Sequence, residues 1–155
     1  MLLLLFLIGN ERFGLDVTRV IEVTPMAVLK KAPADAAHVA GLFNYRGSVV
    51  PVIDLSCLLQ GRPSRPRLST RIILVDYNTG SDSAQHILGL LAERVTETVT
   101  CRKEDVRSPG IGFDNAPYLG DIVIDNQGMI QYVLVEQLLP HWLQESLFPA
   151  AKEQP

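Results

Sequence analysis

The most constraining feature of this sequence is the apolar run at residues 49–55, which reads VVPVIDL and is rich in β-branched side chains. A strand with one wet face alternates apolar and polar residues, whereas a strand buried on both faces reads as a nearly continuous apolar run. The composition of this run therefore favours a strand packed on both faces. Pro51 has no N–H for a ladder hydrogen bond, so we expect an edge position or a β-bulge at that residue.

Residues 44–47, Asn-Tyr-Arg-Gly, come just before that run and have the composition of a tight turn. Gly47 can adopt a positive φ, and the side chain of Asn44 can hydrogen-bond the local backbone. Such a turn would hold Arg46 at the mouth of the buried strand, where its five donors could bind carboxylates or helix carbonyls. The residues alone leave open whether Arg46 contacts a partner or pairs with an acidic side chain of its own domain.

The bulk properties describe one ordinary globular domain. The chain has 155 residues, 47% of them apolar and 20% charged, with a formal net charge of −3. The negative net charge gives no case for a nucleic-acid partner, which would call for a basic face. Cys57 and Cys101 have no histidine at metal-ligand spacing. We therefore expect no metal, no cofactor and no disulfide framework, with both thiols reduced as in a cytosolic protein.

The strand and turn signals along the chain are short and frequent, which suits its ten prolines and eleven glycines. Residues 1–8 lack the basic start and the cleavage site of a signal peptide and are too short to span a membrane, so we expect a first strand there. A turn at 9–10 and a strand at 12–15 would complete a hairpin. Further strands are predicted at residues 16–23 (with a break at 19–20), 49–55, 72–76, 86–91, 93–99, 118–124 and 129–135, and short helices at 33–39, 56–60, 136–139 and 141–151.

Two segments have no apolar periodicity. Residues 62–71 hold four arginines and two prolines and are predicted to form an exposed connector between two halves of the chain. A second interpretation of this segment is a basic patch that contacts an acidic partner. Residues 102–117 are polar and contain glycines, and a loop of that length is typical of a mobile or functional segment.

The two halves of the chain resemble each other. At an offset of 75 positions, residues 13–15 match residues 88–90, and Arg19, Val20 and Glu22 match Arg94, Val95 and Glu97. At an offset near 80, the apolar run after Gly47 matches the run after Gly128. Two copies with so long a period indicate two similar β-units and not a solenoid. Roughly five strands per unit suit a pair of small barrels packed side by side.

Signals of catalysis are weak. His38, His86 and His141 lie in unrelated settings, and no nucleophile elbow, HExxH spacing or phosphate-binding glycine loop occurs. Asp54 ends the buried strand, where a carboxylate could have a perturbed pKa, although we prefer to interpret it as the cap of the following helical turn. We therefore expect a binding module without catalytic residues and not an enzyme.

The segment at residues 41–55, GLFNYRGSVVPVIDL, resembles the central signature of CheW-like domains, which are scaffold modules of bacterial chemosensory arrays. The usual pattern is roughly G-[LV]-x-N-[LI]-R-G-x-[VI]-[VL]-P-[VI]-[IV]-D-L, and this chain departs from it at Tyr45, where an aliphatic residue is usual. The resemblance covers about residues 2–140. It implies a mainly β fold of two five-stranded SH3-like barrels around a shared core. The expected halves are residues 12–70 and 71–135, with the first strand and the C-terminal segment completing them and no receiver domain.

The resemblance also implies a function. CheW-like proteins bridge chemoreceptor tips and a CheA-type histidine kinase, whose regulatory domain has the same double-barrel fold, in cytoplasmic arrays associated with membrane-bound receptors. The helical receptor tip would dock in the groove between the barrels, and no direct membrane insertion is expected. Carried over by position, the receptor-binding residues would be Asn44, Arg46, Gly47, Gly89 and Val95, and the kinase-binding residues would be Val20, Glu22 and Val23.

Other interpretations stay open on the sequence alone. Val23, Val95 and Gly89 also fit ordinary strand packing. An adaptor of this kind could serve surface behaviour or second-messenger synthesis in place of flagellar motility. From a different class, the chain could be a small-molecule sensor or enzyme of double-barrel form, which would need a closed polar pocket with residues 102–117 as its lid.

Overall fold

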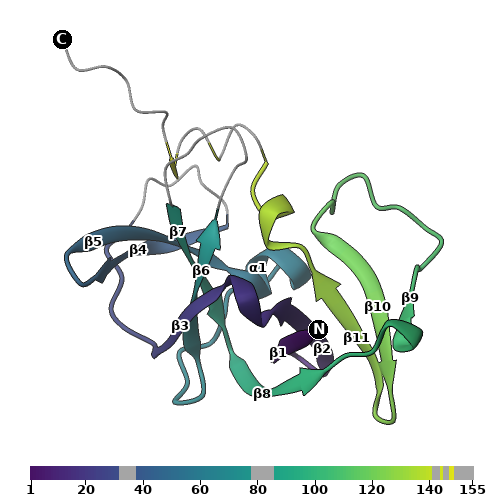
Figure 1. Ribbon diagram of the computed structural model, residues 1–155. Coiled ribbons are helices and arrows are strands. Elements are labelled where there is room, and N and C mark those ends of the chain that lie inside the picture. The colour runs from purple at the N-terminus through teal and green to yellow at the C-terminus, as the bar shows by residue number, and fades with distance from the viewer. Residues whose placement is uncertain (32–37, 78–85, 141–143, 145–146, 149–155) are drawn as a thin grey trace.

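The computed structural model describes residues 1–31, 38–77, 86–140, 144 and 147–148. Its strands form a six-stranded sheet in the order β8-β1-β2-β11-β10-β9 and a five-stranded sheet in the order β3-β6-β7-β5-β4 (Figure 1). The architecture is mainly β, and its two curved sheets are consistent with two small SH3-like barrels. The described part of the chain has no helix long and apolar enough to cross a membrane.

The elements have the following bounds. The strands are β1 (Leu2–Ile8), β2 (Glu11–Asp16), β3 (Val20–Pro25), β4 (Val39–Tyr45), β5 (Ser48–Asp54), β6 (Arg71–Tyr77), β7 (His86–Ala92), β8 (Arg94–Thr100), β9 (Val106–Arg107), β10 (Leu119–Asp125) and β11 (Gly128–Val133). The helical elements are short, namely η1 (Val17–Arg19), α1 (Leu55–Gln60), η2 (Lys103–Asp105) and η3 (Val135–Gln137).

Strand β1 is apolar throughout because both of its faces are buried. Leu4, Phe6 and Ile8 pack into the large core cluster that both sheets share, while Leu3 and Leu5 face a second cluster inside the six-stranded sheet. Successive side chains of a strand point to opposite faces, so a strand between two cores needs no polar residues. Each fully buried leucine contributes about 1.5–3 kcal/mol to folding.

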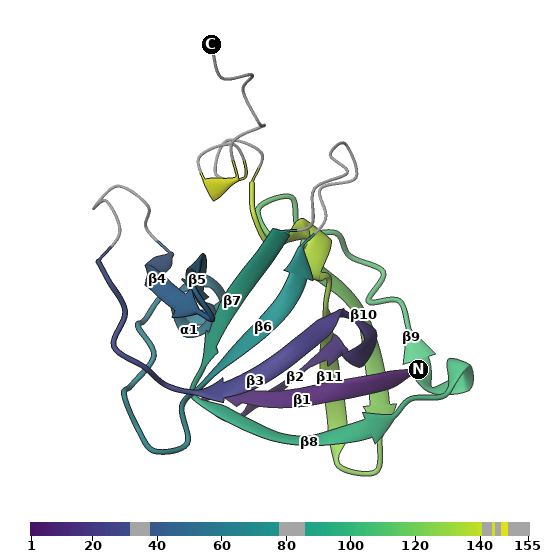
Figure 2. The same ribbon diagram turned by 60° about the vertical axis from the view of Figure 1, so that its left-hand side comes forward.

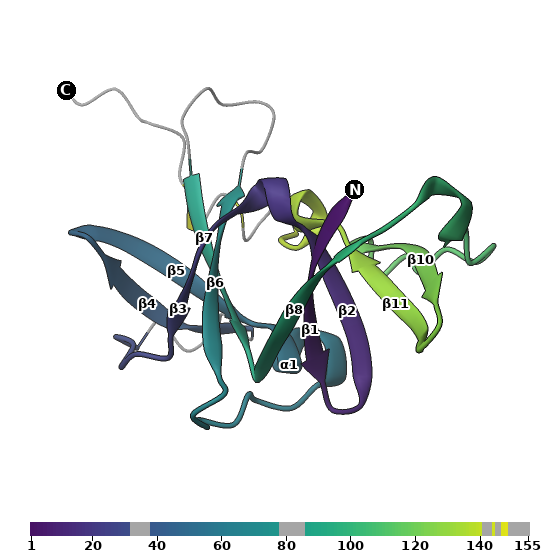
Figure 3. The ribbon, with the colours of Figure 1, turned by 60° about the horizontal axis from the view of Figure 1, so that its bottom comes forward.

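Strand β6 has the same role in the five-stranded sheet. Ile73, Val75 and Tyr77 point into the shared core, and Ile72 and Leu74 pack into a third cluster on the opposite face. Each sheet thus has its own small core and one face in common with the other sheet. Figure 3 views the strands of the two sheets around this shared interior.

The predicted burial of β5 is confirmed, because Val50, Val52 and Ile53 are almost fully buried. Val49 is exposed, so the two-faced burial begins one residue later than expected. The expectation of an edge position at Pro51 is wrong, because β5 lies between β7 and β4. The register shift of the β4–β5 pair lies opposite residues 52–53, and the parallel pairing with β7 begins at residue 52. Pro51 therefore stands just before the part of β5 that is paired on both sides.

The sheets divide the chain differently from the two expected halves. The five-stranded sheet uses consecutive strands from residue 20 to residue 92, whereas the six-stranded sheet combines residues 2–16 with residues 94–133. The expected boundary at residues 70–71 falls inside the five-stranded sheet, because β6 pairs with β3 and β7 pairs with β5. In Figure 2, β4 and β5 lie on one side of the molecule and β10 and β11 on the other.

Most other predicted elements occur with small shifts. The hairpin β1–β2 is present, and the predicted break at residues 19–20 corresponds to the end of η1 and a register shift at the start of β3. Helix α1 ends at Gly61, whose φ of 76° closes it in the left-handed conformation that favours glycine. Residues 102–117 contain η2 and β9. The predicted helices at 33–39 and 141–151 lie largely outside the described residues.

An ion pair supports the short contact between β2 and β11. These strands pair in parallel over two residue pairs, and Arg12 of β2 donates two hydrogen bonds to Asp125 at the β10–β11 turn, each 2.8 Å long. The hydrogen bond from Arg12, together with the backbone N–H of Gln127, holds the pKa of Asp125 below its usual range. The pair therefore fixes the outer hairpin to the rest of its sheet.

Replacing the carboxylate, Asp125→Asn, should lower the free energy of unfolding by about 1–2 kcal/mol at pH 7, because it removes a charge-assisted pair. The pKa of Asp125 is depressed in the folded state, so this stabilisation is present above the unfolded-state pKa and is lost as the pH falls through the folded-state pKa. Urea unfolding of both proteins at neutral and acidic pH should give curves that converge in acid. An equal difference at both pH values would contradict this assignment.

Gly89 is a packing position in the middle of the five-stranded sheet. It pairs with Val52 of β5 and Leu74 of β6 and is buried. A Cβ atom at this position would lie 2.9 Å from Val52 Cγ2 and 3.3 Å from Ile72 Cγ2, closer than side chains normally approach. Glycine at this position therefore allows the interior side chains of β5 and β6 to meet across β7.

The variant Gly89→Ala should lower the free energy of unfolding by about 1–3 kcal/mol, the usual effect of overpacking in a core. Gly112→Ala is the matched control, because a Cβ atom there meets nothing within 4 Å and the backbone is not left-handed. Chemical denaturation of the two variants would measure the difference. Equal midpoints for the two variants would show that β7 can move to accommodate the methyl group.

Candidate functional site

The turn between β4 and β5 has the geometry that its sequence predicts. The backbone N–H of Gly47 donates to Asn44 Oδ1 at 2.9 Å, and the φ of Gly47 is 88°. Arg46 has a φ of 50° and is the one non-glycine residue with a positive φ in the described part of the chain. Residues with a side chain rarely adopt this conformation, and such positions recur at functional sites where the surroundings fix them. The turn therefore holds Arg46 in a defined place at the tip of the hairpin.

Arg46, Tyr45 and Glu22 form one cluster, called the Glu22 cluster below. Glu22 Oε1 accepts a hydrogen bond from Tyr45 Oη at 3.1 Å and from Arg46 Nη2 at 3.2 Å. The Arg46 guanidinium also lies over the Tyr45 ring, 5.1 Å from its centre. Desolvation and the hydrogen bond to Glu22 raise the pKa of the Tyr45 phenol. An aliphatic residue, which is usual at position 45 of the CheW-like pattern, could not make this hydrogen bond. Tyr45 is therefore a further functional candidate, and its departure from that pattern is the sequence signal that identifies it.

The Arg46 side chain remains accessible although it is paired. Its exposed fraction is 75%, against 38% for Glu22. A single hydrogen bond to Glu22 uses one of its five donors. The two interpretations of Arg46, an internal ion pair and a contact with a partner, are therefore compatible in this geometry.

The strand β3 forms an outer edge of the five-stranded sheet and carries the three predicted kinase-binding residues. Glu22 belongs to the Glu22 cluster, Val23 is 37% exposed, and Val20 packs partly against the shared core. Ile21 is 40% exposed and was not among the predicted site residues. An edge strand with exposed apolar side chains is a typical protein-binding feature.

Two predicted receptor-binding residues lie away from the Glu22 cluster. Gly89 is buried within β7, so it can shape a surface only through the packing of its neighbours. Val95 lies on β8, next to Phe6 of β1, and packs partly against the shared core. The structure thus brings Asn44, Arg46 and Gly47 together with Glu22 and leaves Gly89 and Val95 outside this group.

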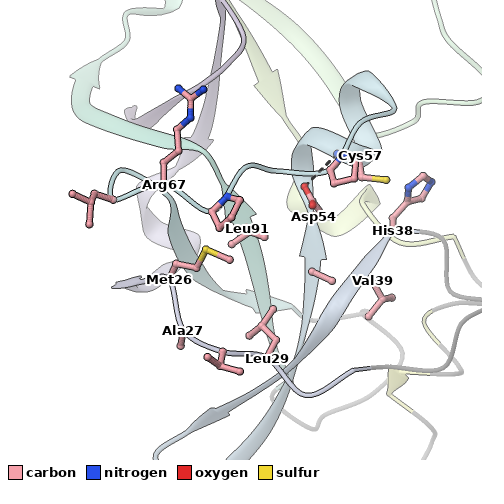
Figure 4. A pocket seen from close by; sticks show the side chains of 14 residues that line it. Met26, Ala27, Leu29, His38, Val39, Asp54, Cys57, Arg67 and Leu91 are labelled. Atoms are coloured by element: carbon pink, nitrogen blue, oxygen red, sulfur yellow. Dashed lines mark hydrogen bonds between the residues drawn. The ribbon is translucent and has the colours of Figure 1, made fainter.

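An apolar groove of about 730 Å³ lies beside β5 and the start of α1. Figure 4 shows Met26 and Leu29 along one part of the groove and Cys57 with His38 at another. Its lining residues come from 26–29, 38–40, 54–57, 63–68 and Leu91, and none comes from residues 102–117. This groove is therefore not the lidded polar pocket that a small-molecule sensor or enzyme would need.

Two ionisable groups at this groove, Asp54 and Cys57, have environments that disfavour catalysis. Asp54 is buried and caps α1, as expected, by accepting a hydrogen bond from Cys57 N at 3.3 Å. It also accepts hydrogen bonds from Ser64 N at 2.8 Å and Ser64 Oγ at 2.6 Å. Burial and the nearby Asp54 charge raise the pKa of the Cys57 thiol, which disfavours a nucleophilic thiolate. His86 lies 4.6 Å from the Phe148 ring, away from this groove, and His141 lies outside the described residues. The described residues include no cluster of three acidic, histidine or cysteine side chains that could hold a metal ion.

Comparisons with known proteins agree with this fold. The family model described as CheW-like domain matches residues 2–142. The chain is 25% identical over 135 residues to chemotaxis protein CheW of Helicobacter pylori, covering 86% of this chain and 78% of that protein. It is 27% identical over 144 residues to chemotaxis protein CheW of Rhizobium meliloti, covering 89% and 86%. The crystal structure of scaffolding protein TtCheW from Thermoanaerobacter tengcongensis is similar in fold, with a TM-score of 0.76 and 24% identity over 90% of this chain and 87% of that one.

Proposed function

This chain belongs to the CheW-like domain family, and from that membership we propose that it is a non-catalytic adaptor that couples chemoreceptor tips to a CheA-type histidine kinase. Its relatives are chemotaxis proteins by name, which supports a coupling role in a chemosensory array at the cytoplasmic side of membrane-bound receptors. The observation that carries the proposal is the Arg46 side chain, which a fixed turn presents to solvent at 75% exposure.

The receptor contact is proposed to centre on the β4–β5 turn. Asn44 and Gly47 fix the turn, and Arg46 supplies four donors beyond the one that Glu22 accepts. A helical hairpin tip offers acidic side chains and terminal carbonyls, which a guanidinium can bind in pairs. Gly89 and Val95 would act indirectly, because Gly89 sets the packing of β7 and Val95 sets the position of β8.

The kinase contact is proposed to use the edge strand β3. Val23 and Ile21 present exposed apolar side chains, and the outer backbone of β3 has no strand partner in the described part of the chain. Val20 anchors the strand to the shared core from the other face. A second double-barrel domain could bury these side chains against its own edge, with apolar burial as the main source of affinity.

Glu22 lies where the two proposed contacts meet. It is on the kinase-facing strand and holds the receptor-facing Arg46 through a 3.2 Å ion pair. A receptor carboxylate that replaced Glu22 as the partner of Arg46 would release Glu22 and change the charge of the β3 edge. This shared residue supports an adaptor in which the two contacts influence each other.

The charge reversal Arg46→Glu should leave the thermal melt within about 2 °C of the wild type, because exposed ion pairs contribute little to stability. It should weaken co-assembly with receptor particles at least about tenfold, since a like charge replaces a bidentate donor. Sedimentation of the adaptor with receptor-containing membranes or nanodiscs would measure the change. Arg107→Glu is the matched control on the six-stranded sheet.

The double variant Arg46→Glu with Glu22→Arg separates the two roles of Arg46. It restores an internal ion pair with reversed polarity, so it would recover receptor binding if the pair alone mattered. Under the proposal, binding stays weak because the donor fork is moved from the tip of the β4–β5 turn to strand β3. Full recovery in the double variant would therefore reject a direct receptor contact.

The variant Val23→Asp should weaken binding to the kinase regulatory domain at least about tenfold, because it places an unpaired charge in an apolar contact. Met129→Asp is the control, since Met129 is 67% exposed on β11 of the other sheet. Titration calorimetry with the isolated regulatory domain would compare them. Equal losses for the two variants would place the contact elsewhere than on β3.

A further inference from the structure

A second concavity, called the arginine pocket below, has its own set of lining residues and borders the apolar groove described above at Arg67. It is formed by the β1–β2 turn, the connector between α1 and β6, and the junction of β7 and β8, which lie along the lower edge of Figure 3. Its volume is about 330 Å³. Its lining residues are Leu7, Gly9, Asn10, Arg62, Arg65, Arg67, Ser69, Glu93 and Arg94.

The charge of the arginine pocket is unbalanced. Glu93 accepts hydrogen bonds from Arg62 Nη1 at 2.8 Å and from Ser56 Oγ at 3.2 Å, so its carboxylate is engaged with Arg62. Within the described residues, no carboxylate pairs with Arg65, Arg67 or Arg94. Three arginines without a carboxylate partner among the described residues therefore line one concavity. All three arginines are exposed, so an anion from solvent can reach them.

The connector holds two of these arginines in place. Thr70 is fully buried, and its hydroxyl donates to Arg65 O at 2.5 Å and accepts from Arg67 N at 3.1 Å. A further backbone bond, Arg67 N to Arg65 O, is 2.9 Å long. Residues 65–69 are exposed, as the composition predicts, and Thr70 nevertheless fixes their backbone. Its alternate residues Arg65, Arg67 and Ser69 all line the arginine pocket.

We propose that the arginine pocket binds a phosphate-bearing anion. Guanidinium forks match the tetrahedral oxygens of a phosphate and bind them in pairs, and the Ser69 hydroxyl and Asn10 amide can complete the coordination. The concave shape favours a compact ligand of pyrophosphate size over a flat acidic protein surface. The site is independent of the Glu22 cluster, since the β4–β5 turn lies on the left of Figure 3 and contributes no lining residue.

The test is titration calorimetry of the full chain with inorganic pyrophosphate at about 0.05 M salt, where screening is modest. Saturable one-to-one binding is expected. The double variant Arg65→Gln with Arg67→Gln should weaken it at least about tenfold, and Arg94→Gln should weaken it several-fold. The backbone bonds of Thr70 do not depend on these side chains, so unliganded melting temperatures should match the wild type. Arg102→Gln is the control, because Arg102 is 76% exposed outside the pocket.

A second arm identifies the source of the phosphate. Cosedimentation with phosphatidylglycerol vesicles that depends on Arg65 and Arg67 would point to a lipid headgroup, whereas pyrophosphate binding without vesicle binding would point to a soluble phosphate compound. The proposal is overturned by the absence of saturable pyrophosphate binding, or by an equal loss in Arg102→Gln. Binding of polyglutamate without binding of pyrophosphate would also overturn it, in favour of an acidic protein segment.

Discussion

Burial of β1 and β6 on both faces is the constraint on which this structure depends. Phe6 and Ile8 of β1 meet Ile73 and Val75 of β6 in one shared core, while the alternate residues of each strand face a smaller core within its own sheet. A polar residue at either face would leave an unpaired group in an apolar interior, at a cost of about 1–3 kcal/mol. The two sheets therefore cannot separate without exposing the centre of both.

This rigidity explains how the fold can present a defined surface. The β4–β5 hairpin extends from the five-stranded sheet, and its tip holds Arg46 in a left-handed conformation beside Glu22. The ordering of these side chains is set by the scaffold before any partner arrives, which lowers the entropic cost of association. The same scaffold exposes the β3 edge next to that tip.

Much of the fold follows from local sequence patterns, and the exceptions have physical causes. Asn44, Gly47 and Gly61 predict their turns because each has a backbone requirement that few other residues meet. The sequence repeat, by contrast, suggests two halves that meet near residue 70. The structure divides the chain differently, because strands far apart in the sequence pair within one sheet. Gly89 carries no local signal that distinguishes close packing from a surface role. The Tyr45 contact with Glu22 joins residues far apart in the sequence, so only the folded chain could reveal it.

The connector between α1 and β6 separates two surfaces of different chemistry. Arg65 and Ser69 line the arginine pocket, while the intervening Pro66 and Leu68 line the apolar groove, with Arg67 bordering both. Because Thr70 fixes the backbone, a substitution at Arg65, Pro66, Leu68 or Ser69 changes the lining of one surface and leaves the other largely intact. Related chains could therefore change the arginine pocket without changing the apolar groove, or the reverse. The connector would then be the boundary between two surfaces that evolve independently.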